Sequence, residues 1–144
     1  MIRIDSHITI ARPVSEVYAW VADLANLPRW QSGVVRSHVV DPGPLRVGTR
    51  FEEDVRVVVF GMKARCVVTD LEPDRRMAFD ADAGPLTYKA EFVFDDVSGA
   101  TDVRVTATAQ MKGAWRLLQP LFAMDARRSV QDELNRIRGH LEAA

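Results

Sequence analysis

Apolar and polar residues alternate at the start of the chain with the period of a β-strand. Isoleucines within residues 2–10 share one face, and polar residues occupy the positions between them. Pro13 then ends the strand and suits the first turn of a helix, so a short amphipathic helix is predicted from there to about Asp23. A second short helical segment is predicted to run through Trp30.

The alternation continues from Val34 to Met111, and turn residues divide this stretch into six further strands. The turn signals all contain Pro or Gly and lie at Pro42-Gly43-Pro44, Phe60-Gly61, Pro73-Asp74, Gly84-Pro85 and Ser98-Gly99. Each strand has one apolar and one polar side, most clearly in residues 86–94 and 103–111. Strands of this kind, joined by short connections, predict an antiparallel sheet that is covered on a single face.

Beyond Gly113 the period becomes helical and stays so for the remaining chain. A stripe of apolar residues spaced three and four apart runs from Val130 to Leu141, and the charged residues beside it are predicted to form a solvated face with i,i+4 pairs. Residues 115–124 are instead apolar on nearly all sides, which predicts that other parts of the protein enclose them. Pro120 is expected to bend or restart the helix.

A terminal helix of about 28 residues would be roughly 40 Å long, so a small sheet must curl to cover it. We therefore predict an α+β fold in which a curved, seven-stranded antiparallel sheet closes around the C-terminal helix, with two short helices after the first strand. Small residues stand among bulky aromatic ones on the inner face, which predicts an apolar cavity between sheet and helix. In the alternative, large and small side chains interdigitate and the core is full.

The composition fits one globular domain over residues 1–144, with 47% hydrophobic and 27% charged residues. The 19 basic and 20 acidic residues are interspersed, and this predicts no basic field that would attract nucleic acid or anionic lipid. We find no apolar run of the ~18 residues that a membrane-spanning helix needs and no signal-peptide core. We therefore expect no integral membrane association and a cytoplasmic location.

The residues that usually hold metals or form disulfides are sparse and scattered. Cys66 is the single cysteine, and the three histidines lie on separate predicted elements without other ligands at metal spacing. We expect an inert buried thiol at Cys66 and neither a metal nor another cofactor.

Three short motifs follow one another along the chain. They are Asp-x-x-Asn-x-Pro-x-Trp ending at Trp30, Gly-Thr-x-Phe ending at Phe51 and Glu-Pro-x-Arg ending at Arg75. With the predicted order of elements, they resemble the SRPBCC or START-like superfamily over almost the whole chain, close to its polyketide cyclase/dehydrase and lipid-transport branch. The resemblance implies a helix-grip fold with a deep pocket between sheet and C-terminal helix for lipids, hormones, polyketides or other hydrophobic ligands. Members either catalyse or only bind, so the resemblance leaves the activity open.

The residues predicted to line the cavity share an inward position in the alternation or a place along the terminal helix. They are Trp30, Phe51, Glu53, Val57, Ala64, Cys66, Phe79, Tyr88, Phe92, Ala107, Trp115, Leu118 and Phe122. Trp30 also resembles a superfamily tryptophan beside the cavity mouth. In the alternative reading, Trp30 only packs the second helix against the sheet.

Glu53 and Tyr88 are the candidate catalytic residues. A carboxyl group on an apolar face would have a raised pKa and could hydrogen-bond or protonate a ligand, while an inward hydroxyl could orient a carbonyl or phenol. Alternatively, Glu53 reaches water or pairs with Arg50 or Arg65, and Tyr88 finds only a backbone partner.

These features favour the binding or carrying of a small hydrophobic molecule, lipid-like, polyketide or aromatic, in the internal cavity. The alternative is an enzyme of the polyketide aromatase/cyclase type that acts in the same cavity. A third hypothesis is an interaction module whose sheet face or terminal helix docks a partner protein, which predicts a filled interior and an exposed apolar patch. Neither the ligand nor the oligomeric state follows from the sequence.

Overall fold

The computed structural model describes residues 1–57 and 60–143 of the chain. The chain begins with β1 (Ile2–Ile10), α1 (Val14–Ala22), a short 3-10 helix η1 (Leu24–Asn26) and α2 (Leu27–Trp30). The strands that follow are β2 (Val34–Val39), β3 (Arg50–Val57), β4 (Phe60–Glu72), β5 (Arg76–Asp82), β6 (Leu86–Val97) and β7 (Ala100–Met111). A 3-10 helix η2 (Gly113–Leu118) then leads into the long α3 (Gln119–Glu142).

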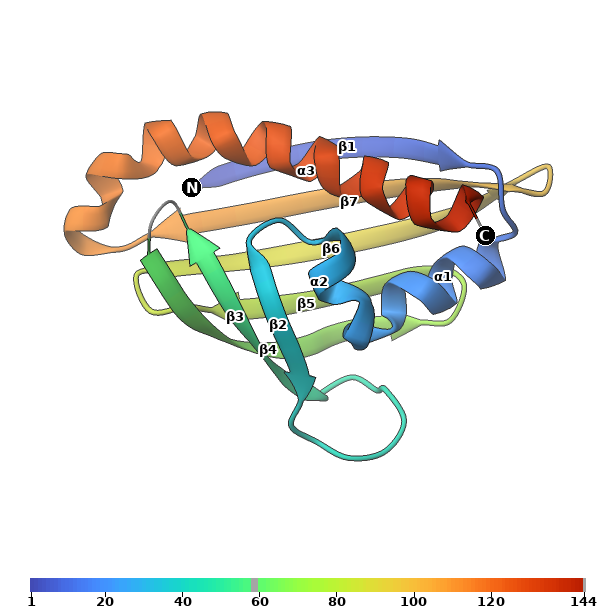
Figure 1. Ribbon diagram of the computed structural model, residues 1–144, viewed down its shortest axis with the longest axis horizontal. Coiled ribbons are helices and arrows are strands. Elements are labelled where there is room, and N and C mark those ends of the chain that lie inside the picture. The colour runs from blue at the N-terminus through green and yellow to red at the C-terminus, as the bar shows by residue number, and fades with distance from the viewer. Residues whose placement is uncertain (58–59, 144) are drawn as a thin grey trace.

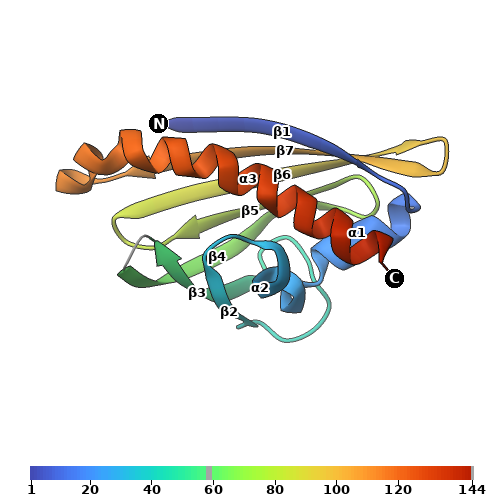
Figure 2. The same cartoon turned by 45° about the horizontal axis from the view of Figure 1, so that its top comes forward.

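The strands form one seven-stranded sheet in the order β1-β7-β6-β5-β4-β3-β2, with antiparallel neighbours throughout. Register shifts in β2 and β4 mark bulges, which bend strands and increase their twist. The sheet curves, α3 crosses its concave side, and α1 and α2 lie near the C-terminal end of α3 (Figures 1 and 2). The predicted helix-grip architecture is confirmed.

The tightly packed core lies beneath the second half of α3. The apolar stripe of this helix is buried from Val130 to Leu141, and α3 packs mainly on β1. Phe92 and Phe94 on β6 contribute aromatic rings to the same core, and Trp30 meets Phe92 edge to face at a centroid distance of 5.5 Å. This packing anchors α2 to the inner face of the sheet.

The Asp-x-x-Asn-x-Pro-x-Trp motif forms the compact connection from α1 to α2. The carboxylate of Asp23 accepts a hydrogen bond from the backbone N–H of Ala25 at 3.1 Å and thereby caps η1. The side-chain amide of Asn26 donates to the carbonyl of Trp20 at 3.0 Å. These two bonds fix the direction in which the chain presents Trp30 to the core.

Gly33 determines how β2 starts after α2. Its φ is +80°, and a Cβ built there would lie 2.7 Å from the carbonyl oxygen of Arg56, so only glycine fits without a shift of the backbone. The carbonyl of Gly33 also accepts a hydrogen bond from the N–H of Arg56 at 2.7 Å. The close approach holds β2 against β3 and helps to place the inner-face residues of both strands.

Two predictions about local structure are wrong. Phe60 and Gly61 do not form a turn, because they belong to β4 and pair with Val57 and Arg56. Residues 115–124 are not enclosed, since Leu121 and neighbouring apolar side chains face solvent. The sheet has only one inner face and can cover only one side of α3, whose first turns reach toward one end of the molecule (Figure 1). The expected effect of Pro120 is confirmed, because α3 restarts after η2 with this proline in its first turn.

Candidate functional site

A carboxyl group, a phenol and a thiol meet on the inner face of the sheet. Glu53 on β3 is only 1% exposed. The hydroxyl of Tyr88, on β6, donates a hydrogen bond to Oε1 of Glu53 at 2.7 Å, and the thiol of Cys66, on β4, donates to the same oxygen at 3.3 Å. The predicted alternative of an ion pair between Glu53 and Arg50 is wrong, because Arg50 pairs with Asp41 at 2.8 Å.

The strand register explains how Tyr88 reaches a residue three strands away. Tyr88 pairs with Ala81 on β5, and Ala81 pairs with Cys66 on β4. The methyl group of Ala81 leaves room for the phenol ring to extend over β5 toward β3 on the concave side of the curved sheet. The cluster therefore depends on a small residue between its members as well as on the polar residues themselves.

Burial sets the protonation of this cluster. Removal from water raises the pKa of Glu53, and the hydrogen bonds from Tyr88 and Cys66 offset part of that rise. Burial also raises the pKa values of the phenol and the thiol, and the nearby Glu53 adds to both shifts. Oε2 of Glu53 is buried and has no hydrogen-bond partner among the described residues. In the protonated acid, this oxygen is free to carry the proton and to donate it to a ligand.

A second carboxyl group faces the interior from the helix. Glu133 on α3 lies on the same face as Val130 and Ile137, and its Oε1 accepts a hydrogen bond from the backbone N–H of Ser32 at 3.0 Å. Burial raises the pKa of Glu133 to about 7, Ser32 and Arg136 oppose the rise, and the charge of Glu53 adds to it. The prediction that the charged residues of this helix all belong to a solvated face is therefore wrong for Glu133.

Arg136 ties the helix to α2 beside this carboxyl group. Its Nε donates to the carbonyl of Trp30 at 2.9 Å, and its Nη2 donates to Oγ of Ser32 at 2.6 Å. The sequence held a signal for Glu133, since a residue three after Val130 and four before Ile137 must point the same way as both. The high charge density of the segment obscures that signal.

The inner face is loosely covered near Tyr88. Tyr88 and three alanines on β6 and β7 point inward but keep accessible surface, whereas residues 92–94 and 103–105 include inner-face side chains that are fully buried. We call this region the open end of the inner face, and it comprises Tyr88, Ala90, Ala107 and Ala109 on the sheet and Trp115, Phe122, Ala123 and Ala126 on η2 and α3. Sheet and helix therefore pack less closely here than beneath the second half of α3.

The remaining predicted lining residues divide between the core and this open end. Phe51, Ala64, Cys66, Phe79 and Phe92 are buried, and Phe51 meets Phe79 edge to face at 5.5 Å. Among the predicted residues, Ala107, Trp115 and Phe122 are partly accessible at the open end, whereas Leu118 is 42% exposed. The side chain of Val57 lies outside the described residues. Trp30 packs in the core, as the alternative reading proposed, and its Nε1 has no hydrogen-bond partner in the described part of the chain.

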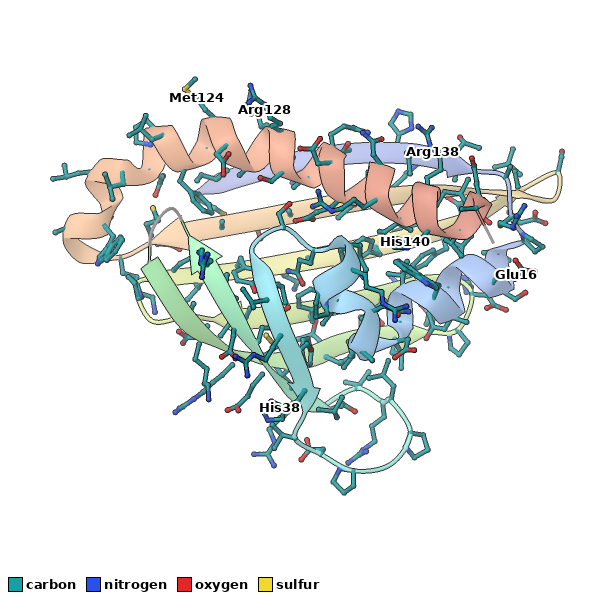
Figure 3. The ribbon with its side chains drawn as sticks, in the orientation of Figure 1. Glu16, His38, Met124, Arg128, Arg138 and His140 are labelled. Atoms are coloured by element: carbon teal, nitrogen blue, oxygen red, sulfur yellow. The ribbon has the colours of Figure 1, made fainter. Side chains whose placement is uncertain are left out.

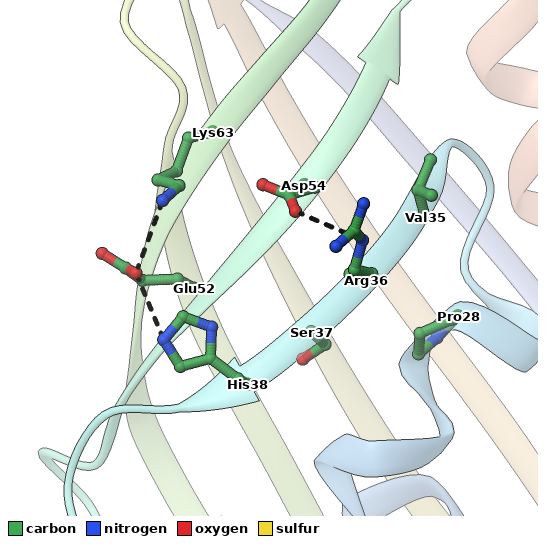
Figure 4. Close-up of a pocket in the computed structure, with 8 residues that line it drawn as sticks. All are labelled: Pro28, Val35, Arg36, Ser37, His38, Glu52, Asp54 and Lys63. Carbon is green, nitrogen blue, oxygen red and sulfur yellow. Dashed lines mark ion pairs between the residues drawn. The ribbon is translucent and has the colours of Figure 1, made fainter.

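Two surface hollows lie elsewhere. One of about 330 Å³ is lined mainly by outward-facing residues of β2, β3 and β4 (Figure 4). Its charged residues pair with one another, Lys63 with Glu52 at 3.9 Å and Arg36 with Asp54 at 3.9 Å. The other, of about 370 Å³, is lined mostly by polar residues on the outer side of the strands from β4 to β7, and Ala81, Tyr88 and Ala109 also border it. Neither hollow is the predicted cavity between sheet and helix.

No described helix is long and apolar enough to cross a membrane. The described His, Cys, Asp and Glu residues form no group of three or more that could hold a metal ion.

Solved structures of low sequence identity share the fold over nearly the whole chain. Protein TTHA0849 from Thermus thermophilus matches with a TM-score of 0.82 at 20% identity, covering 98% of this chain and 97% of that one. A START superfamily protein from Mycobacterium smegmatis has a TM-score of 0.82 at 12% identity, with 98% and 97% covered. The Zhui aromatase/cyclase from Streptomyces sp. R1128 has a TM-score of 0.79 at 16% identity, with 97% and 93% covered. At these identities, the similarity is evidence for the fold alone.

The sequence itself gives the family. No curated protein matches the chain significantly. The family model described as polyketide cyclase/dehydrase and lipid transport matches residues 1–142, a range that includes all three motifs. The predicted resemblance to this family is confirmed, and the chain belongs to the polyketide cyclase/dehydrase and lipid-transport family.

Proposed function

We propose that this protein binds or carries a small, largely hydrophobic molecule at the open end of the inner face, between the first half of α3 and strands β6 and β7. The observation that carries the proposal is the partial accessibility of inward-facing small residues beside the hydrogen-bonded pair of the buried Glu53 and the half-buried Tyr88. The family description, which names polyketide chemistry and lipid transport, supports the same ligand class.

The chemistry of the open end suits such a ligand. Ala90, Ala107 and Ala109 offer apolar surface, and burial of a ligand there would gain roughly 25 cal/mol for each Å² removed from water. Tyr88 borders this surface and is bonded to Glu53. A ligand with a hydroxyl or carbonyl group at one end could place that group at this pair, as is usual for apolar pockets with few polar contacts.

A bulky residue at Ala107 tests the proposal, because it would occupy the proposed space. We expect saturable binding of the uncharged probe N-phenyl-1-naphthylamine to the wild type, followed by its fluorescence. Ala107→Phe should weaken this binding at least about tenfold, which corresponds to about 1.4 kcal/mol. Thr108→Phe is the matched control, since Thr108 is the next residue of β7 and points to the outer side. Circular dichroism and thermal unfolding should show that both variants are folded. Equal affinities in the two variants would overturn the proposal.

The second candidate function is an enzyme of the aromatase/cyclase type in the same space. It is favoured by the 2.7 Å hydrogen bond between Tyr88 and Glu53 and by the pKa of Glu133, which burial raises to about 7. A carboxyl group such as Glu133, which exchanges its proton near neutral pH, suits general acid–base chemistry on a reactive polyketone. The protein would fold the substrate by its shape, and the carboxyl groups would assist proton transfer.

Single substitutions at the pair separate the two candidates. Glu53→Gln and Tyr88→Phe keep the shape of the site and remove the acid and the hydroxyl. With a linear polyketone analogue, an enzyme should lose turnover by about 100-fold or more while its affinity for the probe changes little. A carrier should show no wild-type turnover, and in that case only affinity would respond to the substitutions.

A further inference from the structure

The first turns of the C-terminal helical region carry a group of large apolar side chains that nothing in the described chain covers. Leu117 is 84% exposed, Leu121 68% and Met124 75%, and Leu118 adds to the same end. We call these four residues the apolar tip. We propose that the apolar tip docks on an anionic lipid surface.

The geometry of the helix separates the apolar tip from the open end. Leu121 and Met124 are spaced three residues apart in α3, so they share one face, and Leu117 lies just before this helix in η2. Phe122 and Val130 are on the face turned toward the sheet. Figure 3 shows Met124 and Arg128 pointing away from the sheet. Single exposed apolar residues are ordinary, but a helix end that is apolar on both faces is typical of a segment covered by other apolar material.

The charge around the apolar tip indicates what covers it. Residues 112–128 contain Lys112, Arg116, Arg127 and Arg128 but only one acidic residue, Asp125. This segment has a net charge of +3 in a chain whose total is −1, so the remainder carries −4. The even overall composition conceals this asymmetry. This charge asymmetry would orient the molecule with the apolar tip toward a negative surface and the remainder away from that surface.

The four basic side chains are also free to meet such a surface. None of them forms an ion pair within the residues that the structure describes, although basic residues of the sheet such as Arg50 and Arg76 do so. An amphipathic element with basic residues beside exposed leucines is the kind that lies in the interface of an anionic membrane.

A second copy of the chain fits the apolar tip less well. Two tips in contact would bring two segments of charge +3 together, and the repulsion would oppose the apolar contact. The tip is a projecting helix end, and flexible aliphatic side chains on a projecting end suit insertion among acyl chains.

Docking would also have a consequence for the proposed ligand. Phe122 and Ala123 belong to the same helical turns as the apolar tip and line the open end. A lipid-like molecule could then pass between membrane and protein without crossing bulk water. This consequence rests on the proposed function, whereas the docking itself does not.

Vesicle sedimentation tests the proposal. The probes are vesicles of phosphatidylcholine alone and of phosphatidylcholine with about 30% phosphatidylglycerol, at low and at high salt. We expect binding to the anionic vesicles at least about tenfold stronger than to the neutral ones, and we expect high salt to weaken it. The double variant Leu121→Gln/Met124→Gln should lose most of the binding, and Arg127→Gln/Arg128→Gln should lose the preference for anionic lipid.

The controls use exposed residues away from the apolar tip. Val47→Gln removes an apolar side chain that is 58% exposed in the loop before β3, and Arg138→Gln removes an exposed charge near the other end of α3. Both controls should bind like the wild type. Equal binding to the two vesicle types, no binding to either, or unchanged binding by the Leu121→Gln/Met124→Gln variant would overturn the proposal. A dimer that the same variant dissociates, seen by light scattering, would overturn it in favour of a second copy.

The docking result is independent of the probe-binding result. The Leu121→Gln/Met124→Gln variant should bind N-phenyl-1-naphthylamine within about twofold of the wild type, because its substitutions face solvent rather than the open end. Failure of vesicle binding would thus leave the Ala107→Phe comparison standing, and failure of probe binding would leave the vesicle result standing.

Discussion

Glu133 is one of two carboxyl groups on the interior whose pKa burial raises, and it makes the interior sensitive to pH near neutrality. Burial raises its pKa from 4.5 to about 7, even though the N–H of Ser32 and the charge of Arg136 favour the ionised form. Between these two values the folded protein holds the proton more tightly than the unfolded chain does. The free energy of unfolding therefore falls as pH rises through this window, and the loss is complete above the folded pKa.

Glu133→Gln should remove this contribution to the pH dependence. The amide can still accept the hydrogen bond from Ser32 but does not ionise. Because the pKa of Glu133 rises from 4.5 to about 7 and each pKa unit corresponds to about 1.4 kcal/mol, the variant should be more stable than the wild type at pH 8 by about 3 kcal/mol. Near pH 4 the two should be similar. Urea unfolding across this pH range is the measurement, with Asp132→Asn as a control at an exposed neighbour on α3. The interpretation fails if both variants keep the slope of the wild type.

The orientation of Glu53 and Tyr88 could be predicted from the sequence, whereas their contact could not. Period-two alternation indicates which side of a strand a residue occupies, and it predicts an inward position for both residues. Their hydrogen bond joins β3 to β6, which are not neighbours in the sheet. It depends on the curvature of the sheet and on the small size of Ala81, and neither is visible in local periodicity.

Among the elements, α3 shows what a helical pattern does and does not determine. The stripe from Val130 to Leu141 predicted its buried face correctly, because a helix has one side available for the sheet. The all-round apolarity of residues 115–124 predicted enclosure, but apolarity states only that covering is favourable. It does not state that the same chain supplies the cover, and Leu121 and Met124 show that here it does not.

Turn residues predicted the hairpins well where a positive φ is required. Ser98 and Gly99 both have positive φ between β6 and β7, and Asp74 has a φ of 63° between β4 and β5. Gly61 is different, because it lies in the paired part of β4 opposite Arg56. A glycine in a strand costs some stability but does not end the strand, so composition alone misplaced this turn.

For the molecule as a whole, α3 packs closely against the sheet along its second half and loosely along its first half. All the buried residues of α3 lie between Val130 and Leu141, and none lies in its first turns or in η2. Trp20 of α1 stacks on His140 at 5.3 Å and adds a further contact at the tight end. Local opening requires little free energy where few apolar contacts are lost. The loose end is therefore the part of the molecule that can move without unfolding the rest.

Hydrogen exchange should reveal this division. Backbone amides of residues 121–128 should exchange at least about tenfold faster than those of residues 130–141. Both segments belong to one continuous helix, but only residues 130–141 include buried side chains that hold the helix to the sheet. Saturation with N-phenyl-1-naphthylamine should slow exchange in residues 121–128 and leave residues 130–141 unchanged, since the proposed site is at the open end. Mass spectrometry of peptides from the two segments measures both effects. Uniform protection along α3 without the probe would contradict loose packing of its first half. Slowing of exchange confined to residues 130–141 would place the probe beneath the second half of the helix and contradict the proposed site.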